Sequence, residues 1–557
     1  MRNARRAAGE GLALLGRRLG RPIRALARLN ARAPERLLIA PQDIRTADPT
    51  IAADIYAGYF AFAGKNVNTH GRSPFSVAPP SEGWARTLAG FGWLRHLRAA
   101  DTALARANAR ALVEDWINLA GKSRDPLTWE PTVAARRLLS WLSQSPMILE
   151  EADRDFYSRF MQSVGDHVVF LRDSGARGEA RLRVAIALSG ASLCASDMPG
   201  LQRRAAKMLV DELTRQILPD GGHVSRNPRM LLDLLLDLLP LRQAFSARGL
   251  VAPPELLNAI DRMLPMVRLL RLGDGSLSLF NGMGVTQPHV VATVLAYDDV
   301  LAAAPVNAPA SGYQRLEASG CVATMDTGAP PPYEFSRRSH AGQLSFEFTA
   351  DGHRLVGNCG SPDDTRAAMR EAARATAAHS TLTIADTSSS RFAPPSGLGR
   401  LLDGRVVAGP DMVKAARQDN AEGSAVIAAH NGYAREFGLL HERRLTLAAD
   451  GGKLTGSDRL IPAGEGQPAR AAPDYALRFH LHPAVRATMN EEGNGVMLLA
   501  PNGVWWFFHA FGLPVEIEPG IYFAVSEGAR KAEQIVVQAN GGATPSIDWI
   551  FERLGAG

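Results

Sequence analysis

Cysteine is scarce in this sequence, with three residues among 557. Cys194, Cys321 and Cys359 lie far apart, so at most one disulfide and no Cys-x-x-Cys metal site is expected. Long apolar runs are missing as well, because no stretch reaches the roughly 18–20 residues that a membrane-spanning helix needs. These absences exclude a disulfide-stapled scaffold and a helical integral membrane protein.

The composition that remains is that of a globular protein. Hydrophobic residues make up 46% and charged residues 21%, with 52 glycines and 35 prolines, which excludes collagenous and broadly disordered chains. The length corresponds to about three to four average domains of roughly 150 residues, or to fewer large ones. A sizeable buried core is therefore expected.

Positive charge is concentrated at the N-terminus. Residues 1–36 hold ten arginines and two glutamates, a local net charge of +8. Because the whole chain has a net charge of +6, the remaining residues carry a net charge of −2. The body therefore lacks the basic surface of a nucleic-acid-binding protein, and no nucleic-acid partner is expected.

Residues 12–29 place leucine and isoleucine at spacings of three and four between arginines, which predicts a basic amphipathic helix. Two roles stay open. The helix packs its leucines on the body, which is the commoner role, or residues 1–36 make peripheral contact with an anionic membrane surface. The segment lacks the apolar core and cleavage site of a secretory signal.

Residues 84–305 read as successive helices separated by glycine, proline or aspartate breaks. The predicted helices cover residues 84–99, 131–142, 152–171, 201–218, 228–247 and 254–272. Paired helices of similar length indicate stacked hairpins, as in a toroid or solenoid.

After Pro305 the pattern changes to alternating and β-branched segments punctuated by Asp-Gly and Asn-Gly turns, which predicts an antiparallel β-sandwich. The expected strands cover residues 343–349, 441–448, 475–482, 495–500 and 503–508. The fold class is thus α+β. The expected domains are a basic segment (1–40), an (α/α) toroid (41–305) and a β-sandwich domain (313–557).

Two runs in the β half carry a resemblance: residues 336–360 (SRRSHAGQLSFEFTADGHRLVGNCG) and residues 370–392 (REAARATAAHSTLTIADTSSSRF). They resemble the C-terminal domain of the heparinase II/III family. The helical runs at residues 129–142 (WEPTVAARRLLSWL) and 217–241 (ILPDGGHVSRNPRMLLDLLLDLLPL) are similar to that family too. The resemblance implies an (α/α) toroid followed by a β-sandwich, an anionic polysaccharide as substrate, and lyase chemistry in the cell envelope or periplasm. Without a classical signal, the cytoplasm is the alternative.

Cleavage of a uronate polymer by β-elimination needs a base for a weakly acidic proton, an acid for the leaving oxygen and neutralisation of the substrate carboxylate. The resemblance implies His340 as a catalytic residue, with Tyr433 and His223 as further candidates. Arginine clamps a carboxylate or sulfate with paired hydrogen bonds. The expected glycan-binding residues are therefore Arg226, Asn227, Arg229, Arg337 and Arg338, although Arg226 and Asn227 equally suit the cap of a helix that begins at Pro228.

Some family members bind a structural zinc through two histidines and an aspartate. The corresponding residues here are His340, His379 and Asn358. Because an amide replaces the carboxylate, hydrogen-bonded roles for both histidines are favoured over a zinc site.

The helical half departs from the family. After the Asp-Gly-Gly turn the family reads approximately Glu-Arg-Ser-Pro-x-Tyr-His, and Met230 stands where the catalytic Tyr is expected. The family's Asn-His pair is also missing from residues 177–188. The expected function is a polysaccharide lyase with a rearranged site that acts by β-elimination on a uronic-acid-containing glycan. The alternatives are a catalytically reduced glycan-binding or envelope-assembly protein and, second, a toroid glycoside hydrolase. The hydrolase would draw its two carboxylates from Glu179, Asp220, Asp233 and Asp237.

Overall fold

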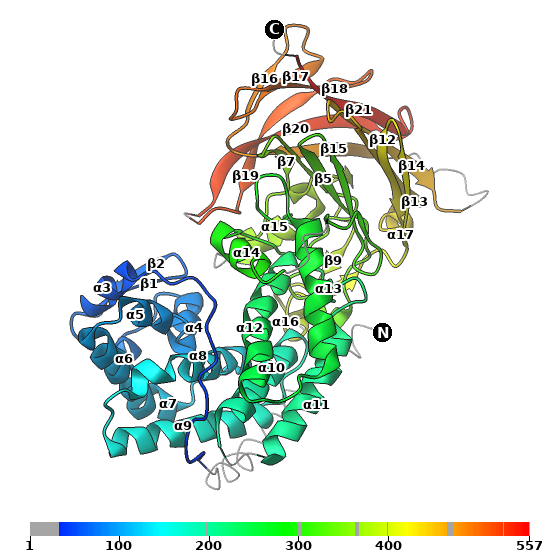
Figure 1. Cartoon of the computed structure of the whole chain (residues 1–557). Coiled ribbons are helices and arrows are strands. Elements are labelled where there is room, and N and C mark those ends of the chain that lie inside the picture. Colours follow the sequence, from blue (N-terminus) through cyan, green and yellow to red (C-terminus); the bar gives the residue numbers. More distant parts are fainter. Residues whose placement is uncertain are drawn as a thin grey trace. The chain divides into compact units, whose positions relative to one another are not determined.

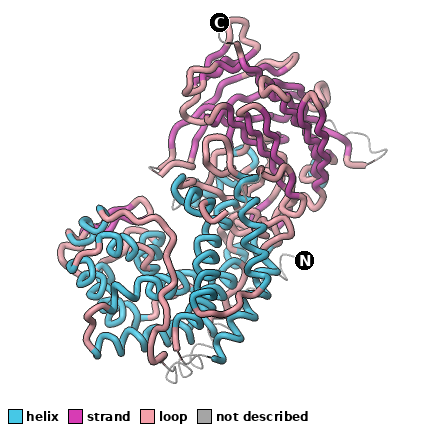
Figure 2. Tube along the Cα trace, viewed as in Figure 1, coloured by secondary structure: helices cyan, strands magenta, loops and turns pink. Residues whose placement is uncertain are grey.

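The computed structural model describes residues 33–196, 199–298, 303–362, 367–397, 399–464, 473–526 and 528–555 (Figures 1 and 2). The amphipathic helix predicted at residues 12–29 lies outside the described residues. The chain divides into two compact units. The helical unit comprises Met1–Ile217, Asp233–Asp261 and Ala292–Tyr297. The sheet unit comprises Leu218–Leu232, Arg262–Val291 and Asp298–Gly557.

The predicted succession of helices is confirmed, and their bounds follow local sequence signals. Proline at the first turn starts α8, α12 and α13, where its missing N–H costs nothing. The principal helices are α3 (Thr50–Tyr56), α4 (Glu82–Gly90), α5 (Leu94–Ala100), α6 (Ala103–Asp115), α8 (Pro131–Leu149), α9 (Arg154–Arg172), α10 (Glu179–Cys194), α11 (Pro199–Gln216), α12 (Pro228–Ala247), α13 (Pro254–Leu270) and α14 (Pro288–Leu295). A small hairpin pairs β1 (Tyr59–Phe62) with β2 (Lys65–Asn68). Among the described residues, no helix combines the length and apolarity needed to cross a bilayer.

The single helix predicted for residues 84–99 is wrong, because two helices, α4 and α5, occupy this stretch. Phe91 between them has φ 55° in the left-handed region, which ends α4. Its ring is buried and stacks on Trp93 with centroids 5.2 Å apart. Burial of this aromatic ring compensates for a backbone conformation that phenylalanine rarely adopts.

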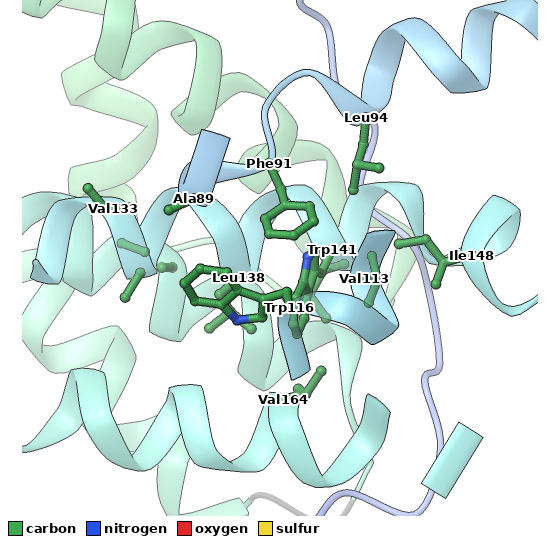
Figure 3. Close-up of a cluster of buried hydrophobic side chains, with 14 of the residues drawn as sticks. Ala89, Phe91, Leu94, Val113, Trp116, Val133, Leu138, Trp141, Ile148 and Val164 are labelled. Carbon is green, nitrogen blue, oxygen red and sulfur yellow. The ribbon is translucent and has the colours of Figure 1, made fainter. Parts of the chain in front are cut away.

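Aromatic rings fill the core of the helical unit (Figure 3). Trp141 of α8 meets Phe91 at 5.5 Å between centroids, and Phe91 meets Trp116 at 5.9 Å, both in edge-on arrangements. Leu138 and Val164 are fully buried in the same cluster. The helical hairpins therefore share one contiguous apolar core.

The sheet unit is the predicted antiparallel β-sandwich. One sheet runs in the order β11-β12-β13-β14-β21-β18-β17-β16 and the other in the order β19-β20-β15-β7-β6-β5-β4-β3, with β8 also paired to β15. The first sheet contains β11 (Val413–Asn420), β12 (Gly423–His430), β13 (Leu439–Ala448), β14 (Lys453–Pro462), β16 (Arg486–Met489), β17 (Gly495–Leu499), β18 (Trp505–Ala510) and β21 (Ser546–Arg553). The second contains β3 (Asn307–Ala308), β4 (Tyr313–Ala318), β5 (Cys321–Asp326), β6 (Phe346–Ala350), β7 (His353–Gly357), β8 (Leu382–Ile384), β15 (Asp474–Leu481), β19 (Glu516–Tyr522) and β20 (Arg530–Asn540).

Side chains from the inner faces of the two sheets interlock. Phe346 of β6 stacks on Trp549 of β21 at 5.4 Å between centroids, and Phe348 meets Trp506 of β18 edge-on at 5.3 Å. All four side chains are buried. This interlocking is the core of a sandwich whose inner positions alternate with outward-facing ones.

We expect Gly456→Ala to lower the free energy of unfolding by about 1–3 kcal/mol, because overpacking forces neighbouring side chains out of their rotamers. Gly456 of β14 lies opposite Trp549, and a Cβ there would come within 2.0 Å of the indole. Denaturant unfolding followed by tryptophan fluorescence measures the change. Gly464→Ala, where a Cβ meets no atom within 4 Å, is the matched control and should leave stability unchanged.

Candidate functional site

The predicted site begins at the Asp220-Gly221-Gly222 turn before α12. Asp220 accepts hydrogen bonds from the Ser311 backbone N at 2.7 Å and from the Ser311 Oγ at 2.6 Å. Gly221 has φ 89°, and a Cβ there would lie 1.9 Å from the carbonyl oxygen of Arg262. Only glycine fits at this position. The turn is therefore held by the bonds of Asp220 to Ser311 and by the close approach of Gly221 to Arg262.

Arg226 is used entirely within the sheet unit. Its guanidinium forms an ion pair with Asp326 and donates to four backbone carbonyls, those of Ser311 (2.7 Å), Gly312 (3.0 Å), Gly328 (3.1 Å) and Ala329 (2.9 Å). The side chain is 5% exposed. Because the N–H groups of its guanidinium are already bonded within the protein, Arg226 has no free pair of donors for a glycan carboxylate.

Tyr313 and Asn281 complete this buried network. The Tyr313 hydroxyl donates to the carbonyl oxygen of Arg226, and the Asn281 Nδ2 donates to Tyr313 at 3.1 Å and to Asp326 at 3.0 Å. Burial raises the pKa of Tyr313. The network therefore holds the tyrosine neutral and bonded, and it does not poise the hydroxyl as a base.

His223 and Asn227 also have structural partners. The His223 Nδ1 accepts from the Ser225 backbone N at 3.1 Å, and its ring is 2% exposed. The Asn227 Oδ1 accepts from the Arg229 backbone N at 2.9 Å, so Asn227 caps α12 in front of Pro228.

Met230, which occupies the expected tyrosine position, is 2% exposed. Arg229, one residue before it, is half-buried. The cavity that His223, Arg226, Asn227 and Tyr313 help to line is about 10 Å³, room for about one water molecule and none for a sugar ring.

The residues predicted as zinc ligands bond to one another and to other protein groups. The His340 Nδ1 and the His379 Nε2 lie 3.1 Å apart in a direct hydrogen bond, and the other nitrogen of His379 bonds the Ala375 carbonyl oxygen at 2.8 Å. Asn358 accepts from the Ser380 backbone N at 2.9 Å and donates from Nδ2 to Glu347 at 3.2 Å. Among the described residues, no group of three or more His, Cys, Asp or Glu is placed to hold a metal ion.

Both imidazoles are buried and electrically neutral. Burial lowers the pKa of His379 to about 4, and burial, with His379 and Arg374 adding to it, lowers the pKa of His340 well below its ordinary value. A neutral imidazole can accept a proton, but the His340 ring is 2% exposed. The pair therefore acts as a hydrogen-bonded link inside the sandwich domain.

We expect the free energy of unfolding to fall as the pH drops from about 6.5 to about 4, because over this range the unfolded state binds protons that the folded His379 does not. One such group changes the stability by up to about 1.4 kcal/mol per pH unit. Denaturant titrations at pH 7, 6 and 5 measure the slope. His379→Gln should make it shallower, and an unchanged slope would contradict a neutral buried His379.

The remaining predicted site residues, Tyr433, Arg337 and Arg338, form no hydrogen bond with His340 or His379. The Tyr433 hydroxyl donates to the Leu382 carbonyl oxygen at 2.8 Å, and the side chain is 1% exposed. Arg337 pairs with Asp403 at 2.8 Å and is 59% exposed, and Arg338 is exposed as well. Of the five predicted glycan-binding residues, only these two arginines are exposed to solvent.

A second buried polar cluster was not predicted from the sequence. Arg443 forms a two-bond ion pair with Asp458 at 2.8 and 3.1 Å, and the Trp549 indole and His441 bond the same carboxylate at 2.8 and 2.7 Å. Arg443 also donates to the carbonyl oxygens of Leu344 and Ser380. Burial alone would raise the pKa of Asp458, but Arg443 and His441 lower it to about 2. The cluster bonds β13, β14 and β21 to the loops of the other sheet.

Two of the four carboxylates considered for a hydrolase form ion pairs. In the helical unit, Asp233 bonds Arg183 at 2.9 Å, and Asp237 bonds both Arg45 and Arg136. Burial alone would raise the pKa of Asp237, but Arg45, Arg136 and Arg183 lower it below its ordinary value. A general acid needs a raised pKa, so this pair gives the hydrolase hypothesis no support.

Comparisons with known proteins agree with this fold. The family model "Heparinase II/III-like, C-terminal" matches residues 302–550. FtsZ-localized protein C from Caulobacter vibrioides is 34% identical over 520 residues, which cover 91% of this chain and 88% of that protein.

Among solved structures, heparinase III superposes with a TM-score of 0.67 at 15% identity, covering 86% of this chain and 79% of that chain. A mutant of the heparan sulfate lyase HepC from Pedobacter heparinus gives 0.64 at 16% identity, covering 99% and 91%. These likenesses confirm the predicted (α/α) toroid and β-sandwich. The chain belongs to the heparinase II/III-like family and has its lyase-like scaffold.

Proposed function

We propose that this chain is a binding protein on a lyase scaffold, which localises with FtsZ and does not cleave polysaccharide. The observation that carries the proposal is Met230, a buried thioether where the family motif has its catalytic tyrosine. Methionine cannot take or give a proton, so the toroid contributes no base at this position.

The three residues predicted as catalytic, and Tyr313 beside them, support the same proposal. His223, Tyr313, His340 and Tyr433 are each at most 2% exposed and are bonded to protein partners. A lyase that used one of these four would need it at the surface and within reach of a substrate.

The partner is proposed from the relative that is 34% identical over 91% of this chain, whose name states that it is localized with FtsZ. Glycan contact through the exposed Arg337 and Arg338 stays a prediction. So does contact of residues 1–36 with an anionic membrane, because that segment lies almost wholly outside the described residues.

The proposal is tested by imaging a fluorescent fusion of the full chain in cells that carry labelled FtsZ. The fusion should form a band that coincides with FtsZ and should disperse when FtsZ is depleted. A fusion that stays uniformly distributed while FtsZ bands are present would contradict the proposed localisation.

A further inference from the structure

The described chain begins on the surface of the helical unit, where two helices hold it. The Tyr157 hydroxyl in the first turn of α9 donates to the Glu35 carbonyl oxygen at 3.3 Å. Just past the end of α10, the Ser196 backbone N donates to the Arg36 carbonyl oxygen at 2.9 Å. Residues 1–32 are therefore joined to the body between the start of α9 and the end of α10.

The two sides of this junction carry opposite charge. Residues 150–155 (EEADRD), which lead from α8 into α9, hold four acidic residues and one arginine, a local net charge of −3, and these charged side chains are exposed. On the other side α10 ends at Cys194 and α11 begins at Pro199, with Arg203 and Arg204 exposed. An arginine-rich segment is attracted to the first side and repelled by the second.

Part of the acidic charge has no partner in the described chain. Glu150 pairs with Arg106 at 3.5 Å, and the Asp153 carboxylate caps α9 by accepting from the Phe156 backbone N at 2.7 Å. Within the described residues, neither Glu151 nor Asp155 forms an ion pair or a side-chain hydrogen bond, and both are exposed. These two carboxylates are available to cations from the segment that precedes Ala33.

The same surface leaves apolar area partly uncovered. Leu149, Ala152 and Tyr157 pack against the core of the helical unit on one side and are only half-buried. Residues 12–29 carry the complementary pattern, with leucine and isoleucine at spacings of three and four, five arginines and no acidic residue. A helix of this pattern would cover the apolar side chains and direct its arginines to the carboxylates around them.

The connection is long enough for this contact. Four residues lead from Leu29 to Ala33, and an extended chain spans about 3.3–3.6 Å per residue, or about 13 Å in all. Asp153 lies one helical turn from Tyr157, about 6 Å along α9. Because the segment is tethered beside the surface, its effective concentration there is high, and weak charge contacts suffice to hold it.

We propose that residues 12–29 dock on the surface of residues 149–157, with their leucines against its half-buried apolar side chains and their arginines on Glu151 and Asp155. The docking occupies the same arginines that an anionic membrane surface would attract, so it acts as an autoinhibitory contact. It goes beyond the proposed localisation with FtsZ and does not depend on it.

Hydrogen–deuterium exchange of the full chain, followed by mass spectrometry at low salt, tests the docking. The double variant Glu151→Gln/Asp155→Asn should speed the exchange of residues 12–29 about fivefold, as expected for the loss of two exposed charge contacts. High salt should have the same effect on the wild type. Glu255→Gln/Asp261→Asn, which removes the same charge from α13 of the same unit, is the matched control and should exchange as the wild type does. The exchange of α8 shows whether each variant is folded.

Vesicles of phosphatidylglycerol and phosphatidylcholine separate the docking from membrane binding. They should compete for the segment, so that residues 149–157 of the wild type exchange faster once vesicles are added. The proposal is overturned if residues 12–29 exchange equally fast in the wild type and the folded Glu151→Gln/Asp155→Asn variant, or if the α13 control loosens them to the same extent. Vesicles that protect residues 12–29 and leave residues 149–157 unchanged would also overturn it, because the segment would then serve the membrane alone.

Discussion

Replacing Arg443 by methionine is expected to lower the free energy of unfolding by about 3–5 kcal/mol, the cost of leaving a buried carboxylate without its cation. Asp458 is fully buried, so bulk solvent does not replace the lost guanidinium. Two backbone carbonyls, those of Leu344 and Ser380, would also lose their donor. Denaturant unfolding followed by the fluorescence of Trp549, which bonds Asp458, measures the effect.

The pH dependence gives an independent readout of the same cluster. The folded pKa of Asp458 is lowered to about 2, so its contribution to stability is fully present above the unfolded pKa of about 3.9 and is lost as the pH falls toward 2. In Arg443→Met the folded pKa should rise and the loss should begin at higher pH. Arg444→Met, one residue along and facing outward, is the matched control. An Arg443 variant as stable as this control would contradict the account.

Replacing Arg226 by methionine is expected to cost a similar amount, about 3–5 kcal/mol, because Asp326 would remain buried without its ion pair. Four carbonyls would also lose their donor. If Arg226 instead bound a ligand from outside, its removal would leave stability nearly unchanged. The two roles are therefore separated by a thermal or denaturant melt without any ligand.

Arg337→Met is the control for this experiment, since Arg337 is exposed and pairs only with an exposed aspartate. Exposed ion pairs contribute about 0–1 kcal/mol, so this variant should melt close to the wild type. An Arg226 variant that is indistinguishable from Arg337→Met would show that the buried network does not stabilise the sheet unit.

Local signals in the sequence predicted most of the fold. Proline at the first turn and apolar periodicity placed the helix at residues 228–247, which is α12 to the residue. Alternation placed β13 within two residues of its start. The helix at residues 84–99 failed because the left-handed Phe91 is stabilised by rings from other elements, and no local pattern shows that.

The site was harder to predict because its residues are defined by distant partners. Arg226 carries the charge and fork of a glycan-binding residue, but Asp326 lies 100 positions along the chain. Tyr433 was predicted as a catalytic candidate, but its hydroxyl bonds a carbonyl 51 positions away. Asn281 and Arg443 were missed for the same reason. Residue type indicates which hydrogen bonds and proton transfers a side chain can make. Only tertiary packing determines whether its partners are other protein groups or a ligand.

The central claim is that the scaffold does not cleave polysaccharide, and one assay tests it most directly. Purified protein is incubated with alginate, heparan, chondroitin, hyaluronan and the host's own acidic exopolysaccharide, and the ultraviolet absorbance of unsaturated uronate products is followed, with an active heparinase as the positive control. We predict no increase above the blank for any polymer. A rise in absorbance that disappears in a folded His340→Ala variant would establish lyase chemistry and contradict the account.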